Sequence, residues 1–217
     1  MGLFSFLKSD KPDFSDKVWM STEYALKGMM TDALQMITKN EMPIALSFFD
    51  DTSMQIKEFL TTKQVPYFVI DSSNMQEAAT QSKVVFVLDA GILYSSSQVV
   101  SFLLDQSKNQ KVNFLFFGHY PIPTKENKTL EKINTLSNKT ITFYSSLDDA
   151  AFKILGTDRI RATLEKLGLA DEEAIEHDMV SRSMKNAREK IEENVKHEIV
   201  CSTEKEWYHK NYKGKEN

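Results

Sequence analysis

The chain has 217 residues, a hydrophobic fraction of 41% and a net charge of −4, which describes a folded, mildly acidic protein and gives no support to nucleic-acid binding. Its one cysteine excludes an intramolecular disulfide and fits a reducing compartment. The apolar run at the N-terminus is too short for a signal peptide, and no stretch approaches the roughly 20 apolar residues of a membrane span, so the cytoplasm is the expected location.

The chain opens with a predicted tail, residues 1–15, followed by a predicted helix from about 17 to 39. Met30, Leu34 and Ile37 recur at helical spacing and form the expected apolar row of that helix. We expect this helix to lead into the main domain, residues 16–147.

Five runs of the main domain have the composition of buried strands. They are mostly continuous and apolar rather than alternating, which is typical of strands covered on both faces and therefore of a parallel sheet. The runs are residues 44–49, 67–70, 84–88, 112–117 and 140–144.

The segments between these runs carry apolar residues at helical spacing, notably 54–60, 99–104 and 130–136. Strand and helix therefore alternate with short links, which implies right-handed crossovers. The predicted fold is an α/β, doubly wound parallel sheet of about five strands, of the P-loop or RecA-like type, with a C-terminal helical extension.

The extension, residues 148–217, is predicted to be helical and charged. Helices are expected over 148–155, over about 157–167 and over 179–199, with Arg188, Glu192 and Lys196 paired on the outer side of the last. Residues 207–217 are expected to be polar and frayed. One stripe of the long helix is apolar and is our predicted partner surface, with folding back onto the sheet as the alternative. It comprises Val180, Met184, Ala187, Ile191, Val195 and Ile199.

Ligands of parallel α/β sheets bind beyond the carboxyl ends of the strands. The candidate crevice residues found there are Asp50, Asp51, Asp89, Gly91 and His119. The chain has no glycine-rich phosphate loop, and this set is acidic, so a nucleotide phosphate would be repelled. We therefore assign no catalytic, nucleotide-binding or metal-ligating residue, expect no cofactor and predict that the protein is not an enzyme.

A phospho-acceptor receiver domain is the alternative. In that family Asp89 would accept the phosphoryl group, while Asp50 and Asp51 would hold Mg²⁺. Two departures oppose it, because the family's Ser or Thr after the fourth strand is Gly118 here and its Lys after the fifth is Ser145. The competing structural interpretation is that the aspartates cap the turns and helices that follow, and that His119 is an ordinary loop residue.

Five segments of the C-terminal half form a specific series, residues 143–149, 153–160, 165–169, 174–181 and 183–194. This series resembles SecA, the ATPase that drives preproteins through the bacterial Sec channel. In SecA the similar stretch leads from the second motor domain, a helicase-like nucleotide-binding domain, into the long scaffold helix. Upstream the similarity is weaker but collinear, and the whole resemblance covers about a quarter of a SecA chain.

Two departures from SecA bear on function. Ala90 and Gly91 match an Ala-Gly pair of SecA, which SecA continues with Arg-Gly-Thr-Asp, whereas this chain continues with residues 92–95, Ile-Leu-Tyr-Ser. SecA also has an arginine-rich loop before its last strand, where this chain has residues 121–128, Pro-Ile-Pro-Thr-Lys-Glu-Asn-Lys. Such arginines stabilise the transferring phosphoryl group. The resemblance therefore implies a degenerate, stand-alone motor-like domain without hydrolysis.

The resemblance also implies a protein partner, either SecA itself or another Sec component, and a regulatory or interaction role. A homodimer and a residual nucleotide-binding domain are the alternatives. Through such a partner the chain would be peripheral at the inner membrane, because it has no integral segment of its own.

Overall fold

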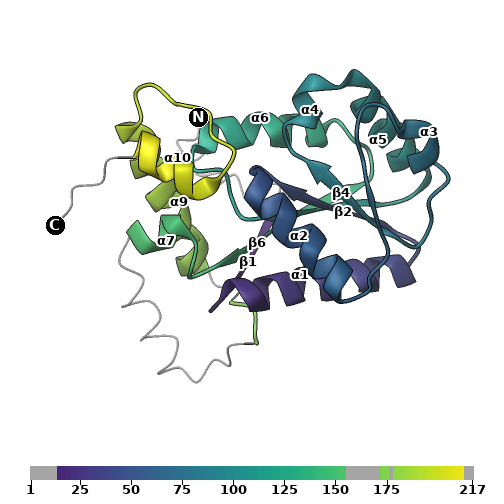
Figure 1. Cartoon of the computed structure of the whole chain (residues 1–217), viewed down its shortest axis with the longest axis horizontal. Coiled ribbons are helices and arrows are strands. Elements are labelled where there is room, and N and C mark those ends of the chain that lie inside the picture. The colour runs from purple at the N-terminus through teal and green to yellow at the C-terminus, as the bar shows by residue number, and fades with distance from the viewer. Residues whose placement is uncertain (1–13, 155–171, 176–177, 213–217) are drawn as a thin grey trace, which may run out of the picture.

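The computed structural model describes residues 14–154, 172–175 and 178–212 of the chain. Its centre is a six-stranded, all-parallel sheet with the order β1-β6-β5-β2-β4-β3 (Figure 1). The predicted α/β class and parallel sheet are thus confirmed, with one strand more than predicted. The strands are β1 (Ser15–Trp19), β2 (Met42–Ser47), β3 (Tyr67–Val69), β4 (Val85–Asp89), β5 (Val112–Phe117) and β6 (Lys139–Ser146).

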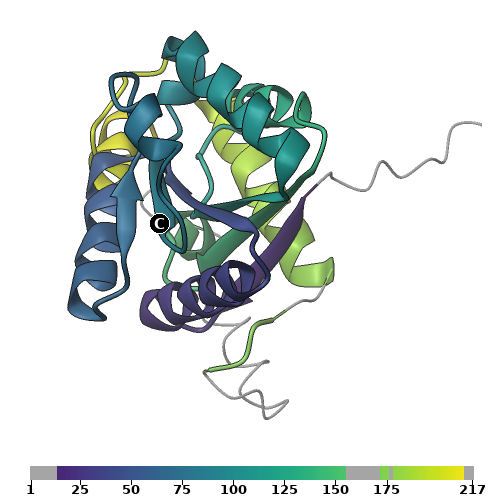
Figure 2. The ribbon, with the colours of Figure 1, turned by 90° about the vertical axis from the view of Figure 1, so that its right-hand side faces the viewer.

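Helices cover both faces of the sheet, as Figures 1 and 2 show. On one face, α1 (Thr22–Thr38) and α2 (Asp50–Thr62) bury apolar residues against β2, β4 and β5. The other face is covered by α5 (Ser97–Asn109) and α6 (Pro123–Asn134), with the short α3 (Met75–Ala78) and α4 (Ile92–Ser95) beside them. The continuous apolar runs are explained by this double cover, since β2 and β5 are buried at every position.

The additional strand is β1, whose residues we had predicted to belong partly to the N-terminal tail and partly to the first helix. Val18 and Trp19 are buried, and the Trp19 ring stacks on Tyr144 of the neighbouring β6 with 5.7 Å between ring centroids. The helix begins only at Thr22, after Ser21 accepts a hydrogen bond from the Tyr24 amide.

The predicted apolar row of this helix was only partly correct. Met30 is buried, but Leu34 is 43% exposed. The true buried face of α1 lies along Ala25, Leu26, Met29, Met30 and Ala33.

The extension folds as α7 (Ala150–Ile154), α9 (Asp178–Asn194) and α10 (Glu204–Asn211) at the carboxyl end of the sheet. Together with Val18, Phe49 and Leu147, these helices enclose an apolar cluster separate from those on the two faces of the sheet. Trp207 is wholly buried in that cluster, so the prediction of a frayed end was wrong at α10. The helix predicted over 157–167 lies outside the described residues. None of the described helices is both long and apolar enough to span a membrane.

The predicted partner surface is largely inside the protein. Val180, Met184, Ala187 and Ile191 are each at most 3% exposed, because α9 lays its apolar stripe on the α/β domain. Val195 is partly buried against the same cluster, whereas Ile199 lies beyond the helix and is 52% exposed. The first four residues are therefore not a free surface, and the alternative of a helix folded back describes them correctly.

The outer side of α9 was also predicted wrongly at one residue. Arg188 is only 5% exposed, and its guanidinium points into the protein rather than toward Glu192. Glu192 instead accepts a hydrogen bond from Thr124 at the start of α6.

Candidate functional site

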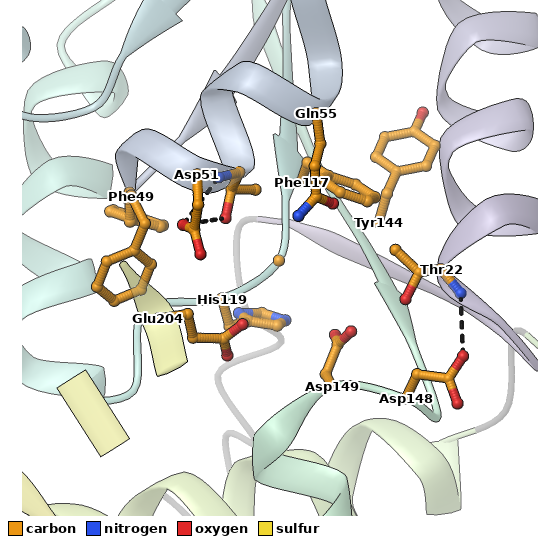
Figure 3. A pocket seen from close by; sticks show the side chains of 13 residues that line it. Thr22, Phe49, Asp51, Gln55, Phe117, His119, Tyr144, Asp148, Asp149 and Glu204 are labelled. Atoms are coloured by element: carbon orange, nitrogen blue, oxygen red, sulfur yellow. Dashed lines mark hydrogen bonds between the residues drawn. The ribbon is translucent and has the colours of Figure 1, made fainter. Parts of the chain in front are cut away.

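A pocket of about 130 Å³ opens where the sheet changes its winding direction. β2 and β5 are neighbours, but β2 leads into α2 on one face and β5 leads into α6 on the other. Doubly wound sheets bind ligands at this position. Figure 3 shows the pocket, whose lining residues are Thr22, Phe48, Phe49, Asp51, Thr52, Gln55, Phe117, Gly118, His119, Tyr144, Asp148, Asp149 and Glu204.

Carboxylates from three elements converge on this pocket. Asp51 belongs to the first turn of α2, Asp149 follows β6, and Glu204 opens α10 (Figure 3). Asp149 is held by Ser146, whose amide and hydroxyl both donate to its carboxylate at 3.1 and 2.8 Å. The three positions are fixed by a helix start, a tight turn and a second helix start.

The carboxyl groups of the pocket are poorly solvated and repel one another. Burial raises the pKa of Glu204 to about 8, and the charges of Asp149 and Asp51 add to the shift, while Lys153 opposes it. Burial likewise raises the pKa of Asp149 to about 6, against the hydrogen bonds from Ser146. At neutral pH Glu204 therefore keeps its proton while Asp149 is mostly ionised, and the pocket disfavours a further negative charge.

His119, at the pocket wall, belongs to a buried charge network. Its Nε2 lies 3.1 Å from Asp16 of β1, and its Nδ1 lies 3.0 Å from Glu126 of α6. Arg188 of α9 completes the network with a 2.8 Å ion pair to Glu126. The ring of His119 also stacks on Phe143, with 4.0 Å between the ring centroids. Two carboxylates thus face one imidazole and one guanidinium.

Opposing effects set the protonation of this network. Burial lowers the pKa of His119, but the charges of Glu126 and Asp16 outweigh burial and Arg188 and leave it above its usual value. Burial raises the pKa of Glu126, but His119 and Arg188 outweigh it and leave it below its usual value. Glu126 is therefore ionised, and its charge is used within the network.

The C-terminal segment covers the crevice from outside. The carbonyl oxygen of Ser202 accepts a 2.8 Å hydrogen bond from the Asp50 amide at the start of α2, a position where an anion would otherwise bind. Glu198 accepts hydrogen bonds from the Trp207 indole and the Tyr120 hydroxyl. The crevice is thus bordered by the chain's own backbone and carboxylates.

The structure brings together only part of the predicted crevice set. Asp51 and His119 line the pocket, and Asp50 lies beside it as the first residue of α2. Asp89 and Gly91 do not line it, because the Asp89 carboxylate accepts a 2.6 Å hydrogen bond from the Gly91 amide and closes the turn after β4.

The receiver alternative is wrong on topology. The five strands predicted from the sequence lie in the order second, third, first, fourth, fifth, whereas receiver-type sheets have the order second, first, third, fourth, fifth. In addition, no cluster of three or more His, Cys, Asp or Glu side chains among the described residues is arranged to hold a metal ion.

Sequence reasoning missed Asp149 and Glu204. β6 runs two residues further than predicted, so the residues just beyond its end are Asp148 and Asp149. Glu204 lies between the predicted long helix, which ends at residue 199, and the predicted frayed end, which begins at residue 207, so no element was predicted for it. The sequence did contain a signal for a helix start there, because Thr203 and Glu206 have the spacing of a capping box. In the structure the Thr203 hydroxyl accepts a hydrogen bond from the Glu206 amide at 3.1 Å.

Comparison with known proteins connects the chain to SecA. No protein-family model matches it. It is 23% identical over 191 residues to protein translocase subunit SecA of Desulfotalea psychrophila, and 26% identical over 192 residues to that of Clostridium kluyveri. These alignments cover 84% and 85% of this chain but only 22% and 23% of the relatives. A shorter match to SecA of Clostridium tetani is 50% identical over 52 residues, 24% of this chain and 6% of the relative.

Among solved structures, the C-terminal part of the Fun30 ATPase domain aligns with 76% of this chain and 54% of its own, at 12% identity and a TM-score of 0.44. By sequence the chain spans less than a quarter of the length of the SecA proteins cited above. The chain is accordingly similar to SecA over most of its own length, and its α/β fold is motor-domain-like.

Proposed function

We propose that this chain is a non-catalytic relative of a SecA motor domain that acts as a protein-interaction module in Sec-dependent protein translocation. The observation that carries the proposal is the acidic crevice. A motor domain needs backbone amides or basic side chains around the phosphates of its nucleotide. Here Asp51, Asp149 and Glu204 converge at that edge of the sheet, and the Ser202 carbonyl accepts the first amide of α2.

Calorimetric titration with ATP and ADP in the presence of Mg²⁺ tests the loss of nucleotide chemistry. We expect no heat of binding and no phosphate release, because a triphosphate entering the crevice would meet three carboxyl groups. A micromolar affinity for either nucleotide would contradict the proposal and would favour the residual nucleotide-binding domain instead.

The link to translocation is tested separately by biolayer interferometry with purified SecA. We expect saturable binding that is unaffected by ATP, because the proposed role does not depend on a nucleotide in this chain. The matched control is a SecA sample blocked with an excess of free chain, which should abolish the signal. A signal that does not saturate, or none at all, would remove the Sec link and leave only the non-catalytic fold.

A further inference from the structure

His119 lies where a single proton decides which neighbour its ring can bind. Its Nε2 lies 3.1 Å from Asp16 of β1, and its Nδ1 lies 3.0 Å from the Glu126 carboxylate of α6. The same Nδ1 lies 2.9 Å from Nη1 of Arg188 on α9. A carboxylate only accepts hydrogen bonds and a guanidinium only donates them, so Nδ1 cannot bind both neighbours in one protonation state.

The two protonation states of the ring therefore hold different partners. In the imidazolium both ring nitrogens carry a proton, so Nδ1 donates to Glu126 and turns a like charge toward the guanidinium of Arg188. In the neutral ring with its proton on Nε2, the hydrogen bond to Asp16 is kept and Nδ1 accepts a hydrogen bond from Arg188. Deprotonation thus gives the guanidinium an additional acceptor and removes the repulsion.

This exchange takes place in a dry site between the α/β domain and the extension. The side chains of His119, Glu126 and Arg188 are 4%, 2% and 6% exposed, so solvent screens their charges poorly. The imidazole ring stacks on Phe143 with 4.0 Å between the centroids, which keeps it beside the guanidinium. Arg188 also donates from Nε to the Tyr120 carbonyl at 2.9 Å, so the contacts of one side chain join α9 to the domain.

We propose that His119 is a proton-operated latch, which holds α9 on the α/β domain when the ring is neutral and loosens α9 when the ring is protonated. Loosening would expose the apolar stripe of the helix, which is at most 3% exposed in the docked form at Val180, Met184, Ala187 and Ile191. A stripe of this kind is a surface that an interaction module can present to a partner. The latch itself rests on the contacts of His119 and not on the proposed function.

The direction of the switch follows from the docked and undocked states of the extension. Burial and the charge of Arg188 lower the pKa of His119, while the charges of Glu126 and Asp16 leave it above its ordinary value. Undocking removes Arg188 and admits water but leaves both carboxylates, so the pKa of His119 is higher undocked than docked. Docking should therefore strengthen as pH rises through these pKa values. Relative to the unfolded chain the sign is opposite, because unfolding removes the carboxylates as well.

Other ionisable groups face the same pocket as His119, and the test has to separate them. Asp51 and Asp148 line the pocket, and burial raises the pKa of Asp149 to about 6. Burial also raises the pKa of Glu204 on α10 to about 8, with the charges of Asp149 and Asp51 adding to the shift. Ionisation of Glu204 weakens the docking of α10 as pH rises, which is the opposite direction. The test therefore uses a Glu204→Gln background and pH values above the pKa of Asp149.

Hydrogen–deuterium exchange of the full chain, expressed as protection factors at pH 6.5 and pH 8.5, measures the docking of α9. We expect the protection of α9 to rise about tenfold relative to that of β5, since linkage to one proton gives at most about a factor of ten for each pH unit. His119→Gln should abolish the rise, because its amide does not titrate. The matched control is His209→Gln, at an exposed position of α10, which should keep the rise.

A second measurement does not depend on the folding of His119→Gln. Titration of the imidazole protons by NMR should give His119 a higher pKa in Arg188→Met than in the parent chain, because the guanidinium charge is removed. Equal protection of α9 at the two pH values, a rise that persists in His119→Gln, or an unchanged or lower pKa of His119 in Arg188→Met would each overturn the latch. These measurements involve neither ATP nor SecA, so the latch and the proposed function can fail separately.

Discussion

Arg188 is predicted to contribute a large share of the stability that joins the extension to the α/β domain. Its guanidinium lies 2.8 Å from the Glu126 carboxylate and donates to the Tyr120 carbonyl at 2.9 Å, and the Arg188 and Glu126 side chains are 6% and 2% exposed. Replacing it with methionine leaves Glu126 as a buried charge with His119 as its remaining counterion. Breaking a buried ion pair in this way costs about 3–5 kcal/mol of unfolding free energy. Because His119 still pairs with Glu126, we expect Arg188→Met to lie at the low end of this range, near 3 kcal/mol.

Urea denaturation followed by far-UV circular dichroism and tryptophan fluorescence measures this cost. The matched control is Lys185→Met on the same helix, because its pair with Glu189 is 71% and 49% exposed and should contribute less than about 0.5 kcal/mol. Adding Glu126→Gln to Arg188→Met should recover part of the loss, since the unpaired charge is then removed. A cost below about 1 kcal/mol, or equal costs for the two single variants, would refute the reasoning.

Three further substitutions test other contacts. The pKa of Glu204 is about 8 in the folded protein against an ordinary 4.5, so the stability of the folded state should fall as pH rises between these values. In urea denaturation, Glu204→Gln should therefore equal the parent in stability near pH 4. At about pH 8 it should be more stable by a few kcal/mol, roughly 1.4 kcal/mol for each unit of pKa. In Gly28→Ala the new Cβ would lie 2.2 Å from the Trp19 ring, so thermal unfolding should show a loss of about 1–3 kcal/mol despite the better helix propensity. Trp207→Ala should cost about 3–5 kcal/mol and increase amide exchange in α10, because the indole is wholly buried and donates to Glu198 at 2.6 Å.

The sheet could be predicted where its strands are buried on both faces, and could not where one strand lies at an edge. Residues 112–117 are apolar at almost every position and form β5 with the predicted bounds. β1 begins Ser-Asp-Lys and is exposed at its start, so only Val18 and Trp19 carry an apolar signal. Its place in the sheet depends on pairing with β6, more than 120 residues away in sequence, and local propensity does not contain that information.

The residues of the candidate site likewise divide into those that could be predicted from the sequence and those that could not. Asp51 and His119 were found because carboxyl ends of parallel strands meet at one edge, whereas Glu204 reaches that edge through the packing of a later helix. Arg188 was missed for a different reason. It lies one turn after the buried Met184, so the helical period places it on the inner stripe, but its charge suggested the outer side.

The contacts of residues 121–128 connect the proposed loss of motor chemistry with the docking of the extension. From the resemblance to SecA, we expect this segment to stand where SecA has its arginine-rich loop. In the structure Thr124 donates to Glu192, Lys125 pairs with Glu198, and Glu126 pairs with Arg188, so the segment holds the extension in place. An arginine at position 126 would set a third cation beside Arg188 and His119 in a buried site, where like charges cost several kcal/mol. An arginine at position 126 is therefore incompatible with the docked extension, and under the proposed function the two features exclude each other.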